Sequence, residues 1–140
     1  MKKYKNKNAL FQIDSLSQLN PDTDSSLDII KEGLKLGLNI WITNPDNLTF
    51  YAGRISFVAS KVKDSSLKLY KSKKIYLEKF DFFFIRQDPP FDMKYISNCY
   101  LLELHQKFNK KPFFINDPTG IKNFTEKIFP LYLIDYQLLI

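Results

Sequence analysis

The sequence predicts an α/β fold whose core is a mainly parallel, four-stranded sheet with helices on both faces. Short apolar segments alternate with longer amphipathic ones along the chain, which is the pattern of strand–helix–strand units. In addition, Phe82–Ile85 is a continuous apolar run, as expected of a strand that is buried on both faces of a parallel sheet. No repeat or low-complexity linker divides the chain, so we expect a single domain over residues 1–140.

The first part of the chain is expected to form a strand, a helix and a second strand. Residues 8–13 make a short apolar strand. Residues 24–26 offer side-chain oxygens that can cap a helix, and apolar residues recur at three- and four-residue steps from 27 to 34. Gly37 is a helix stop, and residues 38–43 form the second strand. Such a unit requires parallel pairing and a right-handed crossover.

From residue 48 onward the sequence pattern changes. Residues 48–77 are expected to form a small, lysine-rich β-excursion at the sheet edge, where lysine discourages edge-to-edge pairing. Beyond the apolar strand, Asp92 caps a long helix, which is expected to be well buried because apolar positions cover much of its circumference. Residues 112–115 form the last strand, and residues 123–126 resemble a capping box that opens a final helix.

Three of the expected strands end in polar residues. Asp14 follows the first strand, Arg86, Gln87 and Asp88 follow the third core strand, and Asn116 follows the fourth. Because ligands of open parallel sheets bind beyond the carboxyl ends of the strands, these residues predict a polar site with Arg86 at its centre. Arg86 can hold a carboxylate by two parallel hydrogen bonds. Alternatively, Arg86 pairs with Asp88 or Asp14 and only fixes loops, and the pattern leaves both readings open.

Composition argues against several function classes. The net charge of +6 comes mainly from scattered lysines, with Arg54 and Arg86 as the only arginines, which favours a solvated surface over nucleic-acid binding; an anionic partner is the alternative. No apolar run approaches the ~18 residues needed to cross a bilayer, so we expect no membrane association and a cytoplasmic location. The four glycines form no phosphate-binding loop, and no side-chain spacing indicates a metal site, so no cofactor or metal is expected in this chain.

The single cysteine and the single histidine do not indicate catalysis. Cys99 lies among apolar residues and is expected to be a small buried side chain. His105 falls late on the long helix, without a serine, cysteine or carboxylate constellation around it. The sequence therefore predicts no catalytic residue.

Three sequence segments indicate more than the pattern of apolar and polar residues does. Residues 85–92 read IRQDPPFD, and together with residues 95–103 they resemble the signature of bacterial glutathione synthetases. Residues 24–26 (DSS), shortly after the first strand, and residues 115–118 (INDP) are similar to further family blocks. The blocks occur in the family's order and spacing, over roughly residues 9–136.

The resemblance implies a Rossmann-like, pre-ATP-grasp domain from an ATP-dependent ligase that joins γ-glutamylcysteine to glycine. In that family, this lobe helps to form the dipeptide-binding cleft and much of an oligomer interface. Arg86 matches the family's substrate-binding arginine, and Gln87, Asp88, Asp14 and Asn116 are the further residues predicted to bind γ-glutamylcysteine. The expected partners are that dipeptide, an ATP-grasp domain and further copies of the chain in a homo-oligomer.

The same resemblance assigns ATP and Mg²⁺ to an ATP-grasp domain that would follow this lobe. The last residues depart from the family pattern, which predicts a chain truncated before that domain and inactive by itself. A stand-alone carboxylate-binding or assembly module without catalysis is the alternative, and a non-functional fragment is a third possibility.

Overall fold

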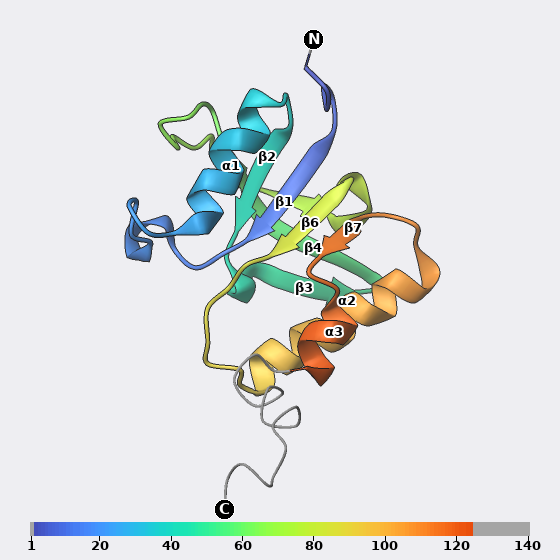
Figure 1. The fold of residues 1–140 in the computed structure, drawn as a ribbon. Coiled ribbons are helices and arrows are strands. Elements are labelled where there is room, and N and C mark those ends of the chain that lie inside the picture. The colour runs from blue at the N-terminus through green and yellow to red at the C-terminus, as the bar shows by residue number, and fades with distance from the viewer. Residues whose placement is uncertain (1, 125–140) are drawn as a thin grey trace, which may run out of the picture.

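A seven-stranded mixed sheet and three α-helices make up residues 2–124, the part of the chain that this computed structural model describes (Figure 1). The helices are α1 (Ser25–Lys35), α2 (Met93–Phe108) and α3 (Pro118–Asn123). The strands are β1 (Asn8–Gln12), β2 (Asn39–Thr43), β3 (Leu48–Tyr51), β4 (Arg54–Lys61), β5 (Lys73–Tyr76), β6 (Phe82–Ile85) and β7 (Phe113–Ile115). No helix in this part is long and apolar enough to cross a membrane.

The sheet is mixed rather than mainly parallel. Its strand order is β3-β4-β2-β1-β6-β7, and β5 pairs with β4 off this path. Parallel pairing joins β2, β1, β6 and β7. Antiparallel pairing joins β4 to β2, β3 and β5. The expected parallel strands are therefore present, but a second, antiparallel part extends the same sheet.

Each face of the sheet carries its own apolar core, because successive side chains of a strand point to opposite faces. On one face, Ile30 of α1 packs over a buried cluster from β1 and β2. On the other face, Leu102 of α2 packs over the second cluster. The first cluster includes Ala9, Phe11, Ile13, Ile40 and Ile42; the second includes Leu10, Phe57, Phe80, Phe83 and Phe114. Helices therefore cover both faces, as expected.

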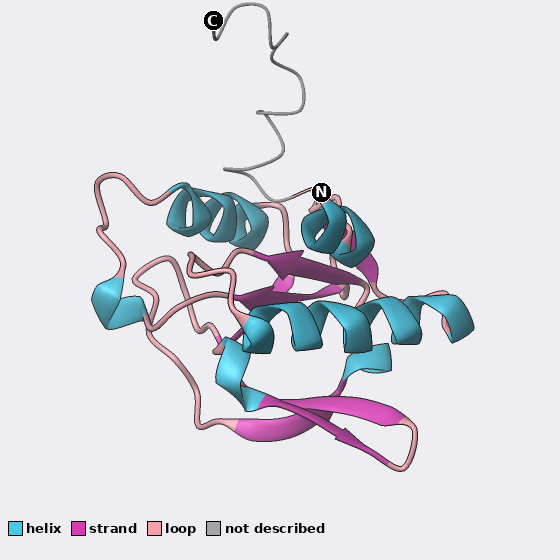
Figure 2. Ribbon diagram, turned by 90° about the horizontal axis from the view of Figure 1, so that it is seen from below, coloured by secondary structure: helices cyan, strands magenta, loops and turns pink. Residues whose placement is uncertain are grey.

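The excursion at residues 48–77 is part of the core and not only an edge feature. The inward-facing Ile55, Phe57 and Ala59 of β4 are each 1% exposed and belong to the α2-side cluster. Figure 2 shows the β3–β4 pair on the other side of α2 from the central strands, so the curled sheet partly encloses that helix. Between β4 and β5, residues 68–70 form no strand and contribute a single bridge, between Val62 and Leu69.

Helix α2 is buried on one side only, which corrects the expectation of a well-buried helix. Its inner side buries Asn98, Cys99, Leu102 and His105. Its opposite side exposes a row of large apolar side chains at spacings of seven and four residues: Met93, Tyr100, Leu104 and Phe108. The apolar residues around most of the circumference of α2 therefore form two faces, one buried and one exposed, and do not indicate complete burial of the helix. The capping box at residues 123–126 and the helix expected after it lie largely outside the described residues.

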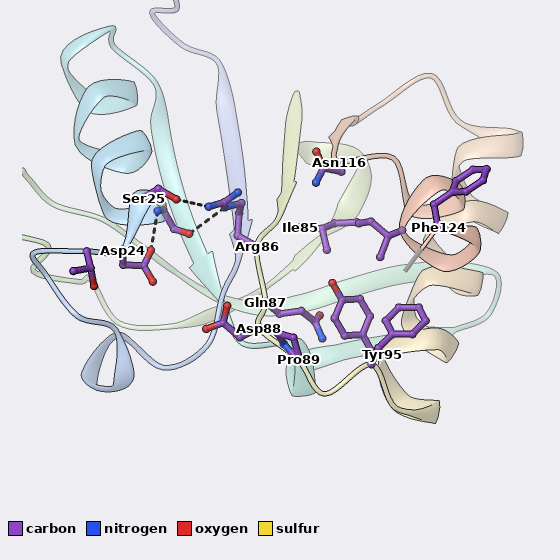
Figure 3. A pocket seen from close by; sticks show the side chains of 14 residues that line it. Asp24, Ser25, Ile85, Arg86, Gln87, Asp88, Pro89, Tyr95, Asn116 and Phe124 are labelled. Atoms are coloured by element: carbon purple, nitrogen blue, oxygen red, sulfur yellow. Dashed lines mark hydrogen bonds between the residues drawn. The ribbon is translucent and has the colours of Figure 1, made fainter. Parts of the chain in front are cut away.

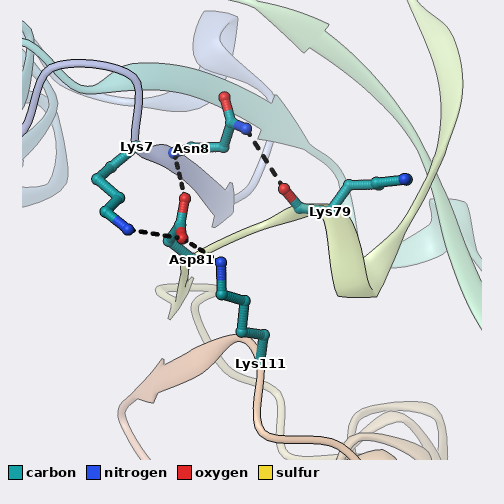
Figure 4. A network of polar contacts seen from close by, with 5 residues as sticks. All are labelled: Lys7, Asn8, Lys79, Asp81 and Lys111. Carbon is teal, nitrogen blue, oxygen red and sulfur yellow. Dashed lines mark hydrogen bonds and ion pairs between the residues drawn. The ribbon is translucent and has the colours of Figure 1, made fainter.

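Asp81 connects the starts of three neighbouring strands (Figure 4). Its carboxylate accepts a hydrogen bond from the Asn8 backbone amide at 2.9 Å and from Lys111 Nζ at 2.6 Å. Lys7 Nζ lies 3.4 Å from the same carboxylate. Burial raises the pKa of the Asp81 carboxyl. The hydrogen bonds from Lys111 and Asn8 and the charges of Lys111 and Lys7 together lower this pKa by more, so it lies below its ordinary value.

We expect Asp81→Asn to destabilise the fold by about 1–3 kcal/mol at neutral pH, because the side chain is only 11% exposed and loses charge-assisted hydrogen bonds. Since the folded-state pKa is depressed, this stabilisation is present above the unfolded pKa, near 3.8, and is lost as the pH falls through the folded value. The difference from the parent protein should therefore shrink below about pH 4. Urea melts of both proteins at several pH values measure it.

Asp46→Asn is the matched control for this change. The Asp46 carboxylate is 66% exposed and, among residues 2–124, its ion pair is with Lys94 at the surface, so its removal should leave the urea midpoint nearly unchanged. Equal midpoints for Asp81→Asn and Asp46→Asn would contradict the structural role of Asp81.

Candidate functional site

A cleft of about 890 Å³ opens beyond the carboxyl ends of β6 and β7 (Figure 3). One wall is the start of α1, residues 23–26, and the segment 85–89 runs between the walls. The opposite side is formed by Asn116, by Tyr95 in the first turn of α2, by Ile121 of α3 and by Phe124, which follows α3. The cleft therefore lies at the edge of the sheet where the sequence predicts a ligand site.

Arg86 is held at the cleft by its backbone and by its side chain. Its amide donates to the Gln12 carbonyl at 2.9 Å, which continues the β1–β6 pairing by one residue. Its Nε donates to Ser26 Oγ at 3.1 Å and its Nη2 donates to Ser25 Oγ at 2.6 Å. Within residues 2–124 no carboxylate forms an ion pair with Arg86, including Asp14 and Asp88 of the alternative reading.

The surroundings of Arg86 favour an anion. The guanidinium group lies beside the first residues of α1, and the N-terminus of a helix carries a partial positive charge. Asp24 caps this end, because its carboxylate accepts from the Ser26 amide at 2.7 Å. The serine hydroxyls orient Arg86 without neutralising it. A carboxylate in the cleft would therefore meet a fixed cation whose charge no ion pair neutralises among the described residues.

The other predicted residues divide into two groups. Gln87, Asp88 and Asn116 line the cleft with Arg86. Asp14 does not line it; its carboxylate accepts from the Asp88 amide at 2.8 Å and so holds the turn after β6. Because β1, β6 and β7 are adjacent parallel strands, the residues that follow them meet at one edge of the sheet.

The apolar side of the cleft is a feature that the sequence reasoning did not assign to the site. Phe91 and Tyr95 lie with ring centroids 4.8 Å apart and line the cleft near Pro89. Ser25 and Ser26 were expected only as helix caps, although they also anchor Arg86. Nothing in the local sequence pattern indicates a contact between α1 and the segment after β6. The sequence held one indication that these serines matter to the site, because residues 24–26 are one of the segments that carry the family resemblance.

Neither Cys99 nor His105 lines the cleft. Burial raises the pKa of the Cys99 thiol to about 11, which keeps the thiol protonated at neutral pH. His105 lies 8% exposed in the α2-side core, with Nε2 at 2.8 Å from the Lys111 carbonyl. Among the described residues, no group of three or more histidine, cysteine, aspartate or glutamate side chains is arranged to hold a metal ion.

The fold and the cleft together define the class: a mixed α/β domain with an arginine-centred cleft at the carboxyl ends of its parallel strands. The family model described as "Prokaryotic glutathione synthetase, N-terminal domain" matches residues 8–122, which run from β1 through nearly all of α3. The chain therefore belongs to the family of prokaryotic glutathione synthetase N-terminal domains.

Curated relatives agree with this family. The chain is 32% identical over 128 residues to a glutathione synthetase of Agrobacterium fabrum, which covers 88% of the chain and 39% of the relative. It is 34% identical over 123 residues to one of Brucella melitensis, covering 84% and 38%. It is 33% identical over 110 residues to one of Anaplasma centrale, covering 77% and 34%. The chain thus spans less than two fifths of the length of these relatives.

Proposed function

We propose that this chain is the lobe of a glutathione synthetase that binds γ-glutamylcysteine, with Arg86 holding one of the dipeptide's carboxylates. The observation that carries this proposal is that the Arg86 guanidinium is fixed by two serine hydroxyls at the start of α1, in a cleft, without a carboxylate partner among the described residues. The finer description of the fold as Rossmann-like and pre-ATP-grasp belongs to the same proposal, supported by the parallel β1–α1–β2 unit.

The remaining cleft residues suit the other groups of the dipeptide. γ-Glutamylcysteine carries two carboxylates, an ammonium group, a peptide bond and a short aliphatic chain. Arg86 binds a carboxylate, while Asp88, which is exposed in the cleft, attracts the ammonium group. The amides of Gln87 and Asn116 supply hydrogen bonds. Asp14 contributes indirectly, because it fixes the turn that carries Asp88.

Ligation of γ-glutamylcysteine to glycine is the proposed activity of the whole protein. ATP and Mg²⁺ are assigned to an ATP-grasp partner domain, which would activate the dipeptide's carboxylate by phosphorylation. This lobe contributes binding and orientation, which lower the entropic part of the barrier by holding the substrate in one position. No residue of the chain is assigned a catalytic role.

A homo-oligomer is part of the same proposal. The outer face of α2 (Met93, Tyr100, Leu104 and Phe108) supports it, because these side chains are between 42% and 80% exposed. Antiparallel packing of this face against a second copy would bury four large apolar side chains on each side. Sedimentation at several protein concentrations tests the idea, and a monomer at all concentrations would contradict it.

Titration of the ¹⁵N-labelled chain with γ-glutamylcysteine tests the binding function. We expect saturable changes of amide chemical shifts at residues 23–26, 85–91 and 116, because these line the cleft or adjoin it. Glycine alone, which lacks most of the proposed contacts, should produce no saturable change. Shifts at random surface sites, or no shifts at millimolar dipeptide, would contradict the proposed function.

A further inference from the structure

Arg86 and Asp88 lie on one side of the segment that runs through the cleft. Figure 3 shows both side chains on the side of α1, while Gln87 between them points the other way, toward Tyr95 of α2. This alternation is expected of an extended segment, and Arg86 still continues the β1–β6 pairing. Gln87 is held on its side by Gln12, whose Nε2 donates to Gln87 Oε1. A cation and a carboxylate therefore face the same half of the cleft.

These two opposite charges do not pair with each other. None of the ion pairs within residues 2–124 involves Arg86 or Asp88. The guanidinium is held instead by the hydroxyls of Ser25 and Ser26, at 2.6 and 3.1 Å. The Asp88 backbone is fixed separately, because its amide donates to the Asp14 carboxylate at 2.8 Å. The cleft thus presents a cation and an anion that are each anchored and that neither neutralises within the described part of the chain.

Fixed opposite charges at this spacing suit an α-amino acid head, in which one carbon carries both a carboxylate and an ammonium group. Alternate residues of an extended segment lie roughly 7 Å apart. Two charge-assisted hydrogen bonds of about 2.8 Å, together with the single carbon between the ligand's charged groups, span a comparable length. In γ-glutamylcysteine, the γ linkage leaves one such head free on the glutamyl residue. The carbon next to the cysteinyl carboxylate carries no ammonium group, because its nitrogen is in the peptide bond.

We propose that Arg86 and Asp88 together recognise the free α-amino acid head of a γ-glutamyl compound, with its α-carboxylate on Arg86 and its ammonium group facing Asp88. This assignment rests on the proposed function for the identity of the ligand, γ-glutamylcysteine. The chemistry of ligation agrees with it, because the cysteinyl carboxylate, which glycine joins, has to stay available for activation. The head then anchors the dipeptide on the α1 side, and the cysteinyl part extends toward the side lined by Phe91 and Tyr95.

The α-linked isomer of the dipeptide gives the first test. α-Glutamylcysteine has the same atoms and the same charges, but its α-carboxylate is used in the peptide bond. Its nearest free carboxylate is therefore separated from the ammonium group by two additional carbons. We expect the parent chain to bind the γ isomer more tightly by about tenfold or more, as measured by isothermal titration under reducing conditions. Equal dissociation constants would overturn the proposal, because net charge alone would then account for binding.

Asp88→Asn, which keeps the size of the side chain and removes its charge, gives the second test. This variant should bind γ-glutamylcysteine about tenfold more weakly than the parent does. N-Acetyl-γ-glutamylcysteine lacks the ammonium group, so the parent should bind it weakly too, and Asp88→Asn should weaken it no further. Asp46→Asn is the matched control at an exposed carboxylate outside the cleft, and it should bind both ligands as the parent does.

The outcomes keep the two proposals apart. If the parent binds none of the three ligands at millimolar concentration, the proposed function fails and the head assignment fails with it. If the parent binds all three equally, or if Asp88→Asn weakens the acetylated ligand as much as the free one, the dipeptide-binding function stands and the head assignment is wrong. If Asp88→Asn does not fold, the isomer and the acetylated ligand still decide the matter, because both comparisons use the parent chain alone.

Discussion

Replacing Phe83 with alanine is expected to lower the free energy of unfolding by about 3–5 kcal/mol. Phe83 is fully buried at the centre of the parallel strands. Its ring centroid lies 5.4 Å from that of Phe57 and 5.5 Å from that of Phe114, so it joins β6 to β4 and β7 at once. Truncation removes the buried ring, leaves a cavity and breaks both ring pairs.

Urea unfolding followed by circular dichroism measures this loss, and Phe113→Ala is its matched control. Phe113 is 66% exposed at the start of β7 and belongs to neither apolar cluster, so its removal should change the free energy of unfolding by no more than about 1 kcal/mol. Because β4 still pairs with β2 in the same sheet, the transition of Phe83→Ala should remain a single one. Two separate transitions would show that the parts of the sheet unfold independently.

The parallel strands were predictable because their signals are local. The apolar segment at residues 8–13 and the run Phe82–Ile85 fall within one residue of the observed strands. The start of α1 at Ser25 follows from its capping residues, since Asp24 does accept a hydrogen bond from Ser26. The edge position of the polar residues then follows from parallel pairing alone.

The antiparallel part was harder to predict because strand partners are not encoded locally. The alternation of Ile55, Phe57 and Ala59 shows one buried face, but the face does not say against which strand β4 pairs. The observed pairing of β4 with β2 brings the excursion into the core and closes the sheet over α2. Likewise, apolar residues all round a helix fit complete burial or a second exposed face equally well, and α2 has the second.

In the site, the chain segment was predictable and the contacts were not. The polar residues after each strand identified Arg86, Gln87 and Asn116 as neighbours. The serine hydroxyls that hold Arg86 come from a helix about sixty residues earlier, so no short-range pattern reports that contact. Gln12 carried a weaker signal, a single amide in an apolar strand, whose meaning depends on the side chain that it meets across the sheet.

Arg86→Met is expected to weaken γ-glutamylcysteine binding by roughly 10- to 150-fold. Hydrogen bonds to charged groups contribute about 1.5–3 kcal/mol each, and 1.4 kcal/mol corresponds to a tenfold change in affinity. Methionine fills similar space without charge, so the loss reports the guanidinium. Arg86→Lys should recover only part of the affinity, because an ammonium keeps the charge but cannot form two parallel hydrogen bonds with a carboxylate.

Arg54→Met is the matched control, since Arg54 is the other arginine of the chain. Its guanidinium pairs with Glu78 and lies 3.6 Å from the centre of the Tyr76 ring, and it does not line the cleft. This variant should therefore bind the dipeptide as the parent does. Isothermal titration of all four proteins, after thermal melts have shown that each is folded, makes the comparison. If a folded Arg86→Met binds as tightly as Arg54→Met, then Arg86 does not hold a substrate carboxylate, and the cleft must be assigned to another ligand.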